Sequence, residues 1–310
     1  MQAYPRCNYC EQPILGEVLS AMGATWHPDH FLCAYCGKPI REPSFNVQDG
    51  RAYHPTCFRE QVLPRCAYCD KPLVGEYLRD YWGNGFHREH EQQYPHCAYC
   101  GRLVPPQQQE LGYQRRAGTI RCPVCRSTAV ETREEAQPLF RQAIQWTGQQ
   151  GLRYNNLSLQ LEIVDRAKLD RYLNESGVTE PHSLGITMSE THIINGRITS
   201  THVNGVAVLT GLPELLFRGV VIHELGHVWL VVQEVQRLPS WQEEGFCELL
   251  SYRFYSEMHT REAQYRAENI ERNPNAVYGG GFRRMHEYVN KRGFPALLYE
   301  LQQTKRLSFR

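Results

Sequence analysis

Two histidines with a glutamate between them are the residues of this chain best suited to chemistry. His223 and His227 are four residues apart, and Glu224 directly follows the first. Residues at this spacing lie one turn apart on the same face of an α-helix, so both imidazoles could bind one metal ion. Glu224 would then lie beside a metal-bound water and accept its proton. The alternative is a pair of partly buried histidines on an amphipathic helix with no metal.

A catalytic zinc needs a third protein ligand and one open position. Residues 241–246 read Trp-Gln-Glu-Glu-Gly-Phe and resemble the Trp-x-x-Glu-Gly-Phe segment of gluzincin peptidases such as aminopeptidase N. The Glu of that segment is a zinc ligand, so the resemblance implies this role for Glu244. Glu243 is the competitor, because a helix start read from sequence is defined only to within a residue or two. Glu248 lies one turn further on, where thermolysin-like enzymes carry a carboxylate that holds the first histidine, here His223.

The resemblance implies a zinc metallopeptidase with an α+β, zincin-like (gluzincin) domain that hydrolyses peptide bonds. Zinc lowers the pKa of a bound water to about 7, and Glu224 would accept its proton and return it to the leaving amine. An oxyanion donor is also expected. Tyr252 and Tyr255 are the candidates, with simple packing as their alternative role. The apolar run at residues 206–210 is expected to hold the substrate as an added strand.

The amino-terminal part of the chain is rich in metal-ligand residues. Eleven of the twelve cysteines precede residue 126, most of them in Cys-x-x-Cys pairs, which suit tetrahedral zinc better than a disulfide framework. Cys247 stands alone and is expected to be a small buried apolar residue. Sixteen ligands predict four structural zinc ions beside the catalytic one: Cys7, Cys10, His27, His30, Cys33, Cys36, His54, Cys57, Cys66, Cys69, His87, His90, Cys97, Cys100, Cys122 and Cys125.

An internal repeat organises these ligands. Residues 10–17, Cys-Glu-Gln-Pro-Ile-Leu-Gly-Glu, correspond to residues 69–76, Cys-Asp-Lys-Pro-Leu-Val-Gly-Glu. The order of Cys and His resembles tandem LIM domains, with His30 and His54 where Cys is usual. The second module is irregular, because six residues separate His90 from Cys97, and His96 is therefore an alternative ligand to His90. LIM domains bind proteins, so the resemblance implies recognition or regulation; the alternative is a purely structural module.

The remaining sequence must position the catalytic residues. Apolar periodicity predicts a helix over residues 133–150, a strand over 157–164 and a short helix over 168–174. Three strands are expected at 185–194, 197–202 and 206–210, separated by Asn-Gly pairs at 195–196 and 204–205 that indicate hairpin turns. Helices are then expected at 213–236, 241–258, 282–291 and 295–304. The first of these contains the apolar run 220–232, which is too short to span a bilayer and predicts a buried helix.

Composition bounds the class of protein. A change near residue 126 predicts LIM-like modules at 1–60 and 61–130 and a peptidase domain at 131–310. The formal net charge of +1 points to neither nucleic acid nor a membrane as partner. The first residues have no apolar core and are not expected to be a signal peptide. With zinc-binding thiolates, this favours a reducing, cytoplasmic compartment.

Nearly the whole chain resembles the plant growth-regulating LIM-domain peptidases that ubiquitin activates. The resemblance rests on the irregular second module and on segments at 211–216, 223–229, 243–246 and 278–283. It implies an endopeptidase with intracellular protein substrates, and ubiquitin or ubiquitylated proteins as partners. Two alternatives remain: a LIM scaffold with a degenerate peptidase domain, and a RING-like ubiquitin-pathway protein. The intact His223, Glu224, His227 and Glu244 argue against the first, and the order of Cys and His against the second.

Overall fold

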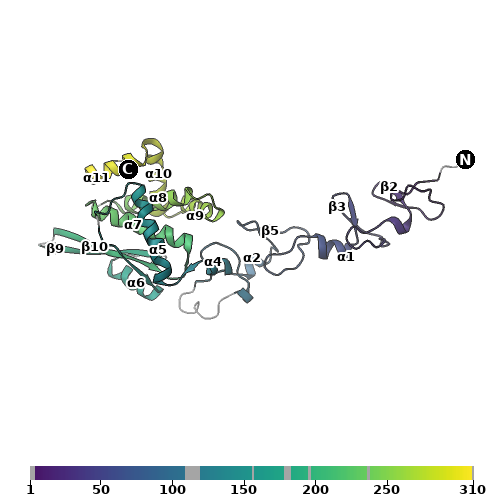
Figure 1. Cartoon of the computed structure of the whole chain (residues 1–310), viewed down its shortest axis with the longest axis horizontal. Coiled ribbons are helices and arrows are strands. Elements are labelled where there is room, and N and C mark those ends of the chain that lie inside the picture. The colour runs from purple at the N-terminus through teal and green to yellow at the C-terminus, as the bar shows by residue number, and fades with distance from the viewer. Residues whose placement is uncertain are drawn as a thin grey trace. The chain divides into compact units, whose positions relative to one another are not determined.

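The chain folds into two compact units of mixed α and β structure (Figure 1). The computed structural model describes residues 4–108, 119–155, 157–177, 183–194, 197–235 and 238–308. The units are Met1–Pro95 and His96–Arg310. Their boundary falls inside the predicted second module at 61–130, so the last four cysteine ligands lie in the same compact unit as residues 131–310.

The first unit consists of hairpins and short helical turns. Its hairpins pair β1 (Leu19–Ala21) with β2 (Ala24–Trp26), β3 (Asn46–Gln48) with β4 (Arg51–Tyr53), and β5 (Leu78–Arg79) with β6 (Gly85–Phe86). The turns are η1 (Pro28–His30), α1 (Pro55–Cys57), η2 (Phe58–Val62) and α2 (His90–Gln93). One apolar cluster contains only four buried residues, Phe31, Cys33, Ile40 and Ala52. A core this small requires metal binding to supply folding free energy.

One backbone turn recurs four times, beginning at Cys7, Cys33, Cys66 and Cys97. Each of these cysteines donates its N–H to the carbonyl five residues on and accepts from the N–H four residues on. The residue four positions on has a φ between 56° and 71° in every copy. Glycine adopts this left-handed conformation without strain at two copies, and Glu11 and Asp70 occupy it at the others. The fourth copy lies in the second unit.

The second unit contains a three-stranded sheet of order β8-β10-β9. β10 (Arg197–Leu209) is central, parallel to β8 (Gln160–Val164) and antiparallel to β9 (Gly185–Ile194). The predicted strands at 197–202 and 206–210 are thus one strand, and the predicted turn at Asn204-Gly205 is wrong. A register shift between Val203 and Gly205 marks a bulge there instead. The Asn-Gly pair at 195–196 lies outside the described residues.

The central position of β10 also corrects the expected substrate strand. Residues 206–209 pair with β8 on one side and β9 on the other, so their backbone groups are not available to an added strand. β9 is at the edge of the sheet among the described residues. The strand expected at 157–164 is shorter than predicted, because β8 begins at Gln160.

Helices make up most of the second unit. They are α4 (Pro123–Ser127), α5 (Arg133–Gln149), α6 (Arg166–Glu175), α7 (Glu214–Val232), α8 (Ser240–Ser256), α9 (Arg261–Arg272), α10 (Tyr278–Arg292) and α11 (Phe294–Thr304), with η3 (Pro106–Gln108) and a short β7 (Ala129–Val130) paired with β11 (Leu212–Pro213). α9 was not predicted as a helix, and the helix predicted at 282–291 begins earlier, at Tyr278. α5 begins at a capping box in which Thr132 and Glu135 bond each other's backbone N–H groups.

α7 is the core helix of this unit and carries the histidine pair. It packs against α8, α5, β10 and β9. Its length and apolarity would suit a membrane span, but 56% of that stretch is buried inside the protein. Gly226 allows the close approach of α8, because a Cβ there would lie 2.8 Å from Cys247 Sγ. The expected apolar burial of Cys247 is confirmed by its 0% exposure.

Candidate active site and metal centres

α7 and α8 bring the two histidines and Glu244 together. Glu244 Oε2 lies 3.1 Å from His223 Nε2 and 3.6 Å from His227 Nε2. A zinc ion bonded to nitrogen and oxygen donors at about 2.1 Å would hold them about 3.4 Å apart. The two distances from Glu244 Oε2 are therefore close to the edge of a zinc tetrahedron.

The other nitrogen of each ring faces a second carboxylate. His227 Nδ1 lies 3.1 Å from Glu243 Oε1, and His223 Nδ1 lies 3.9 Å from Glu248 Oε1. A carboxylate on Nδ1 fixes the tautomer and leaves Nε2 for the metal. Glu243 thus bonds the His227 ring, Glu248 lies at ion-pair distance from the His223 ring, and Glu244 faces both Nε2 atoms.

The electrostatics of the metal-free site favour this pairing. Burial alone would raise the pKa of Glu244, but its contacts with His223 and His227 outweigh it and lower that pKa well below its usual range. Burial alone would lower the pKa of both imidazoles; Glu244 and Glu248 raise that of His223, and the pKa of His227 is raised beside Cys247, Glu243 and Glu244. The negative charge needed beside a dication is therefore built into α8.

Cys247 is a further possible donor at this site. Its sulfur and a nitrogen of each histidine lie within 4.8 Å of one another. Complete burial raises the pKa of the Cys247 thiol to about 12. Because the thiolate is the metal-binding form, Cys247 would have to lose its proton on binding, whereas the contacts of Glu244 with the histidines already favour its ionised form.

Glu224 is held by residues of β9 that the sequence did not single out. The Thr187 hydroxyl lies 2.9 Å from Glu224 Oε2 and 3.0 Å from the Glu224 carbonyl oxygen. A Cβ on Gly185 would lie 2.8 Å from Val220 and 3.1 Å from Glu224 Oε1. No motif connects positions 37 residues apart; only the packing of β9 on α7 brings them together.

Three tyrosines have different places in this unit. Tyr252 donates to Glu271 at 2.7 Å, and Tyr255 is 4% exposed, with its hydroxyl in the space beside Gly219. Tyr278, at the start of α10, stacks on His223 with ring centroids 6.4 Å apart. The two predicted oxyanion candidates thus lie beside Glu271 and Gly219, whereas Tyr278 lies beside the histidine pair. Helix α10 packs closely on α8 because both carry a glycine at the contact: a Cβ on Gly245 of α8 would lie 2.4 Å from the backbone of Gly281 of α10.

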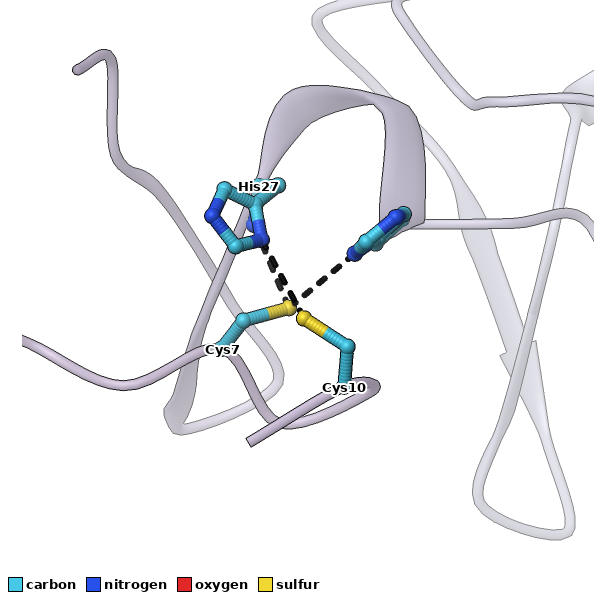
Figure 2. A group of neighbouring side chains, drawn as sticks. Cys7, Cys10 and His27 are labelled. Atoms are coloured by element: carbon cyan, nitrogen blue, oxygen red, sulfur yellow. Dashed lines mark hydrogen bonds between the residues drawn. The ribbon is translucent and has the colours of Figure 1, made fainter. Parts of the chain in front are cut away.

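The sixteen amino-terminal ligands form the four predicted clusters. Within each group of four, the donor atoms lie within 4.8 Å of one another. In the first, Cys7 Sγ lies 3.6 Å from His30 Nδ1, and Cys10 Sγ lies 3.5 Å from His27 Nδ1 (Figure 2). Zinc bonded to sulfur at about 2.3 Å and nitrogen at about 2.1 Å would hold such donors about 3.6 Å apart. The residues thus fit zinc, and zinc binding by the LIM region follows.

The ring orientation in two clusters repeats along the chain. His54 Nε2 lies 3.2 Å from the Pro39 carbonyl oxygen, and His87 Nε2 lies 3.1 Å from that of Pro72. With Nε2–H donating to a carbonyl, Nδ1 is left for the metal. His90 belongs to the third cluster, with a buried Nε2 that has no hydrogen-bond partner among the described residues. The alternative ligand His96 bonds the Gly101 carbonyl instead.

Hydrogen bonds from backbone N–H groups lower the pKa of some of the cysteine ligands. Burial alone would raise the pKa of Cys7, but the N–H groups of His27, Cys10 and Tyr9 outweigh it and lower that pKa to about 5. The N–H groups of Cys36 and His54 likewise lower the pKa of Cys33 to about 6. The thiolate, which is the form that binds zinc, is thereby stabilised.

The fourth cluster is built into the second unit. Cys97, Cys100, Cys122 and Cys125 are all buried. The neighbouring Arg266, on α9, donates to the Tyr99 carbonyl. Arg121 donates to the Gly211 carbonyl at 3.0 Å. Gly211 lies two residues before Pro213, the N-cap residue of α7. This cluster therefore contacts the helices of the candidate active-site unit.

Comparison with known proteins finds two segments of the chain that match known families. Residues 7–62 match the LIM domain, and residues 156–266 match the family described as Protein DA1.

Among plant relatives, the chain is similar to Protein DA1-related 1 and Protein DA1 of Arabidopsis thaliana, at 24% identity to each. The alignments cover 96% and 97% of this chain but 65% and 67% of those proteins. It is 26% identical to the LIM domain-containing protein HDR3 of Oryza sativa subsp. japonica, over 81% of this chain and 56% of HDR3. The chain thus spans about two thirds or less of these relatives.

Proposed function

We propose that this chain is a zinc-dependent endopeptidase whose catalytic residues lie on α7 and α8. The observation that carries the proposal is Glu244 Oε2, 3.1 Å and 3.6 Å from two histidine Nε2 atoms on the helix that also carries Glu224. His223, His227 and Glu244 would hold one catalytic zinc. Bound there, zinc supplies a Lewis acid for the peptide carbonyl and lowers the pKa of a coordinated water to about 7.

Glu224 is the general base of this proposal. Glu224 is 6% exposed, and its carboxylate accepts a hydrogen bond from Thr187. It accepts a proton from the attacking water and delivers it to the leaving amine. Glu243 and Glu248 keep the imidazoles oriented. From this site we infer that the domain has the gluzincin peptidase fold.

The substrate is a protein held in extended form. β9 is the edge strand beside α7, so its backbone groups can pair with a peptide added as a further strand. The four structural zinc clusters would keep the LIM region folded for recognition or regulation. By similarity to plant LIM-domain peptidases, we further propose cytoplasmic protein substrates and ubiquitin or ubiquitylated proteins as partners.

The test compares wild type with Glu224→Gln on a library of proteome-derived peptides, with new termini read by mass spectrometry. Glu224→Gln should keep its zinc and fold but lose about 10²–10⁴ in rate. Glu214→Gln is the matched control, because it makes the same change on an exposed turn of the same helix. Equal cleavage by wild type and Glu224→Gln, or none by wild type, would leave a LIM scaffold or a RING-like protein as the better reading.

A further inference from the structure

We infer that Thr187 is a positioning residue that fixes the orientation of the Glu224 carboxylate; this rests on the proposed function. Thr187 lies on β9, and its side chain contacts Glu224 on the neighbouring helix α7. Its hydroxyl lies 2.9 Å from Glu224 Oε2 and 3.0 Å from the backbone oxygen of the same residue.

The strand register explains why this threonine reaches the helix. Gly185 and Thr187 pair with Val208 and Val206 of β10 and, two residues apart, share one face of β9. Both contact Glu224, whereas the intervening Ile186 is 7% exposed and belongs to the core. A Cβ at position 185 would collide with Val220 and with the Glu224 side chain. The glycine therefore lets β9 come close enough for the next residue on that face to bond the base.

The hydroxyl has one proton and two nearby acceptors. The Glu224 carbonyl oxygen lies within a helix, where it accepts from the N–H four residues on. Because the carbonyl oxygen already has a partner within the helix, the Thr187 proton goes to Oε2. With Oε2 held by Thr187 and Oε1 beside Gly185, the rotation of the carboxylate is restricted, which fixes the direction in which it accepts the proton in the proposed mechanism. Thr187 thus acts through Glu224 and contacts no ligand of the metal itself.

Isosteric substitution tests this role. Thr187→Val keeps the branched side chain and removes the hydroxyl, whereas Thr187→Ser keeps the hydroxyl. Loss of a hydrogen bond to a charged group predicts a kcat lower by about 10- to 100-fold in Thr187→Val. KM and zinc content should not change, and Thr187→Ser should retain most of the activity. The matched control is Thr210→Val, because the Thr210 hydroxyl bonds both the carbonyl and the carboxylate of Glu131.

Two further measurements separate positioning from a structural role. In a Glu224→Gln background, Thr187→Val should cause little further loss of residual activity, because residues that act as a unit are not additive. A peptide hydroxamate provides a readout without turnover: its hydroxyl proton passes to the general base, so its affinity, measured by calorimetry, should fall in Thr187→Val but not in Thr210→Val.

The outcomes distinguish this inference from the proposed function. Cleavage by wild type, none by Glu224→Gln, and equal kcat for Thr187→Val and Thr210→Val would overturn the role of Thr187 alone. Loss of zinc or a large fall in melting temperature in Thr187→Val would also overturn it, in favour of a structural role. If no variant cleaves peptide, the proposed function fails, and equal hydroxamate affinity in wild type and Thr187→Val then overturns the positioning role as well.

Discussion

Three carboxylates on α8 face different atoms of the same two imidazoles. Glu244 faces both Nε2 atoms, Glu243 faces Nδ1 of His227, and Glu248 faces Nδ1 of His223 at a longer distance. The sequence presented Glu243 and Glu244 as competitors for one role. In the folded protein they face different nitrogen atoms, because adjacent helix positions point in directions about 100° apart.

This division predicts an order of zinc loss. Glu244→Ala should release the catalytic zinc and abolish activity, while Glu248→Ala should weaken zinc affinity about 10- to 100-fold. Glu243→Gln should have a smaller effect, because an amide oxygen still accepts from Nδ1–H. Elemental analysis should find about five zinc ions in wild type and one fewer in Glu244→Ala. A greater loss in Glu243→Gln than in Glu244→Ala would exchange their roles.

Zinc affinity of the catalytic site should rise with pH. The pKa of both histidines is raised in the metal-free protein, so each imidazolium persists above the usual pH of about 6.5, and zinc must displace its proton. The same shift stabilises the metal-free fold below that pH, and this contribution is lost as pH rises through the raised pKa. Competition with a fluorescent chelator between pH 6 and 8 measures the effect. An affinity independent of pH would contradict the charged His–Glu pairs.

Tyr278 is the tyrosine best placed to influence the reaction. The Tyr278 ring lies beside His223, so we favour its hydroxyl as the oxyanion donor. Its loss in Tyr278→Phe should lower kcat by more than the loss of the Tyr252 hydroxyl, which bonds Glu271. Removing one donor to a developing oxyanion costs about 10²–10³ in kcat. Steady-state kinetics of the two variants decides the matter. If Tyr252→Phe is the slower enzyme, the original expectation for Tyr252 is restored.

Sequence spacing predicted which residues lie together when they belong to one element, and it did so less well for residues on different elements. The His223–His227 pair and the sixteen amino-terminal ligands could be read from the sequence, because helix and turn geometry relate neighbours along the chain. Thr187 and Tyr278 could not, because their positions beside Glu224 and His223 depend on how β9 and α10 pack. Helix α9, similarly, was missed among charged residues, although its Thr260 cap is a helix-start signal.

At the scale of elements, one turn prediction failed for a physical reason. Asn204-Gly205 has the composition of a hairpin turn, but Gly205 lies in β10 opposite Gln160. A Cβ there would lie 2.2 Å from the Gln160 carbonyl oxygen. The glycine thus serves the close approach of two parallel strands, a long-range requirement that local turn statistics do not contain.

Gly226 controls the separation of the two helices that carry the site. In Gly226→Ala, the new methyl group would meet Cys247 Sγ at 2.8 Å and push α8 away from α7. Overpacking of this kind costs about 1–3 kcal/mol, and moving Glu244 away from the histidines should also weaken zinc binding. Thermal unfolding and zinc titration measure the two effects. Adding Cys247→Ala should restore part of both, and failure to do so would place the strain elsewhere.

At the scale of the molecule, the clusters belong to different units. Cys122→Ser should lower the melting temperature and the activity of the second unit, because its cluster is linked to α9 and to the start of α7. Cys10→Ser should release one zinc from the first unit and leave peptidase turnover near wild type. Differential scanning calorimetry with a peptide assay tests both. Equal effects of the two substitutions would show that the fourth cluster has no special connection to the site.

The position of the fourth cluster also restricts how this architecture could have been assembled. A gene segment that encoded only the residues after the last cysteine pair would lack the Tyr99 carbonyl to which Arg266 donates and the Arg121 side chain that donates to the Gly211 carbonyl. Recombination could exchange everything up to Pro95 without dividing a compact unit. We therefore expect an exchangeable segment that carries the candidate chemistry to begin with the fourth cysteine cluster, because the second LIM-like repeat of the sequence spans the boundary between the two compact units.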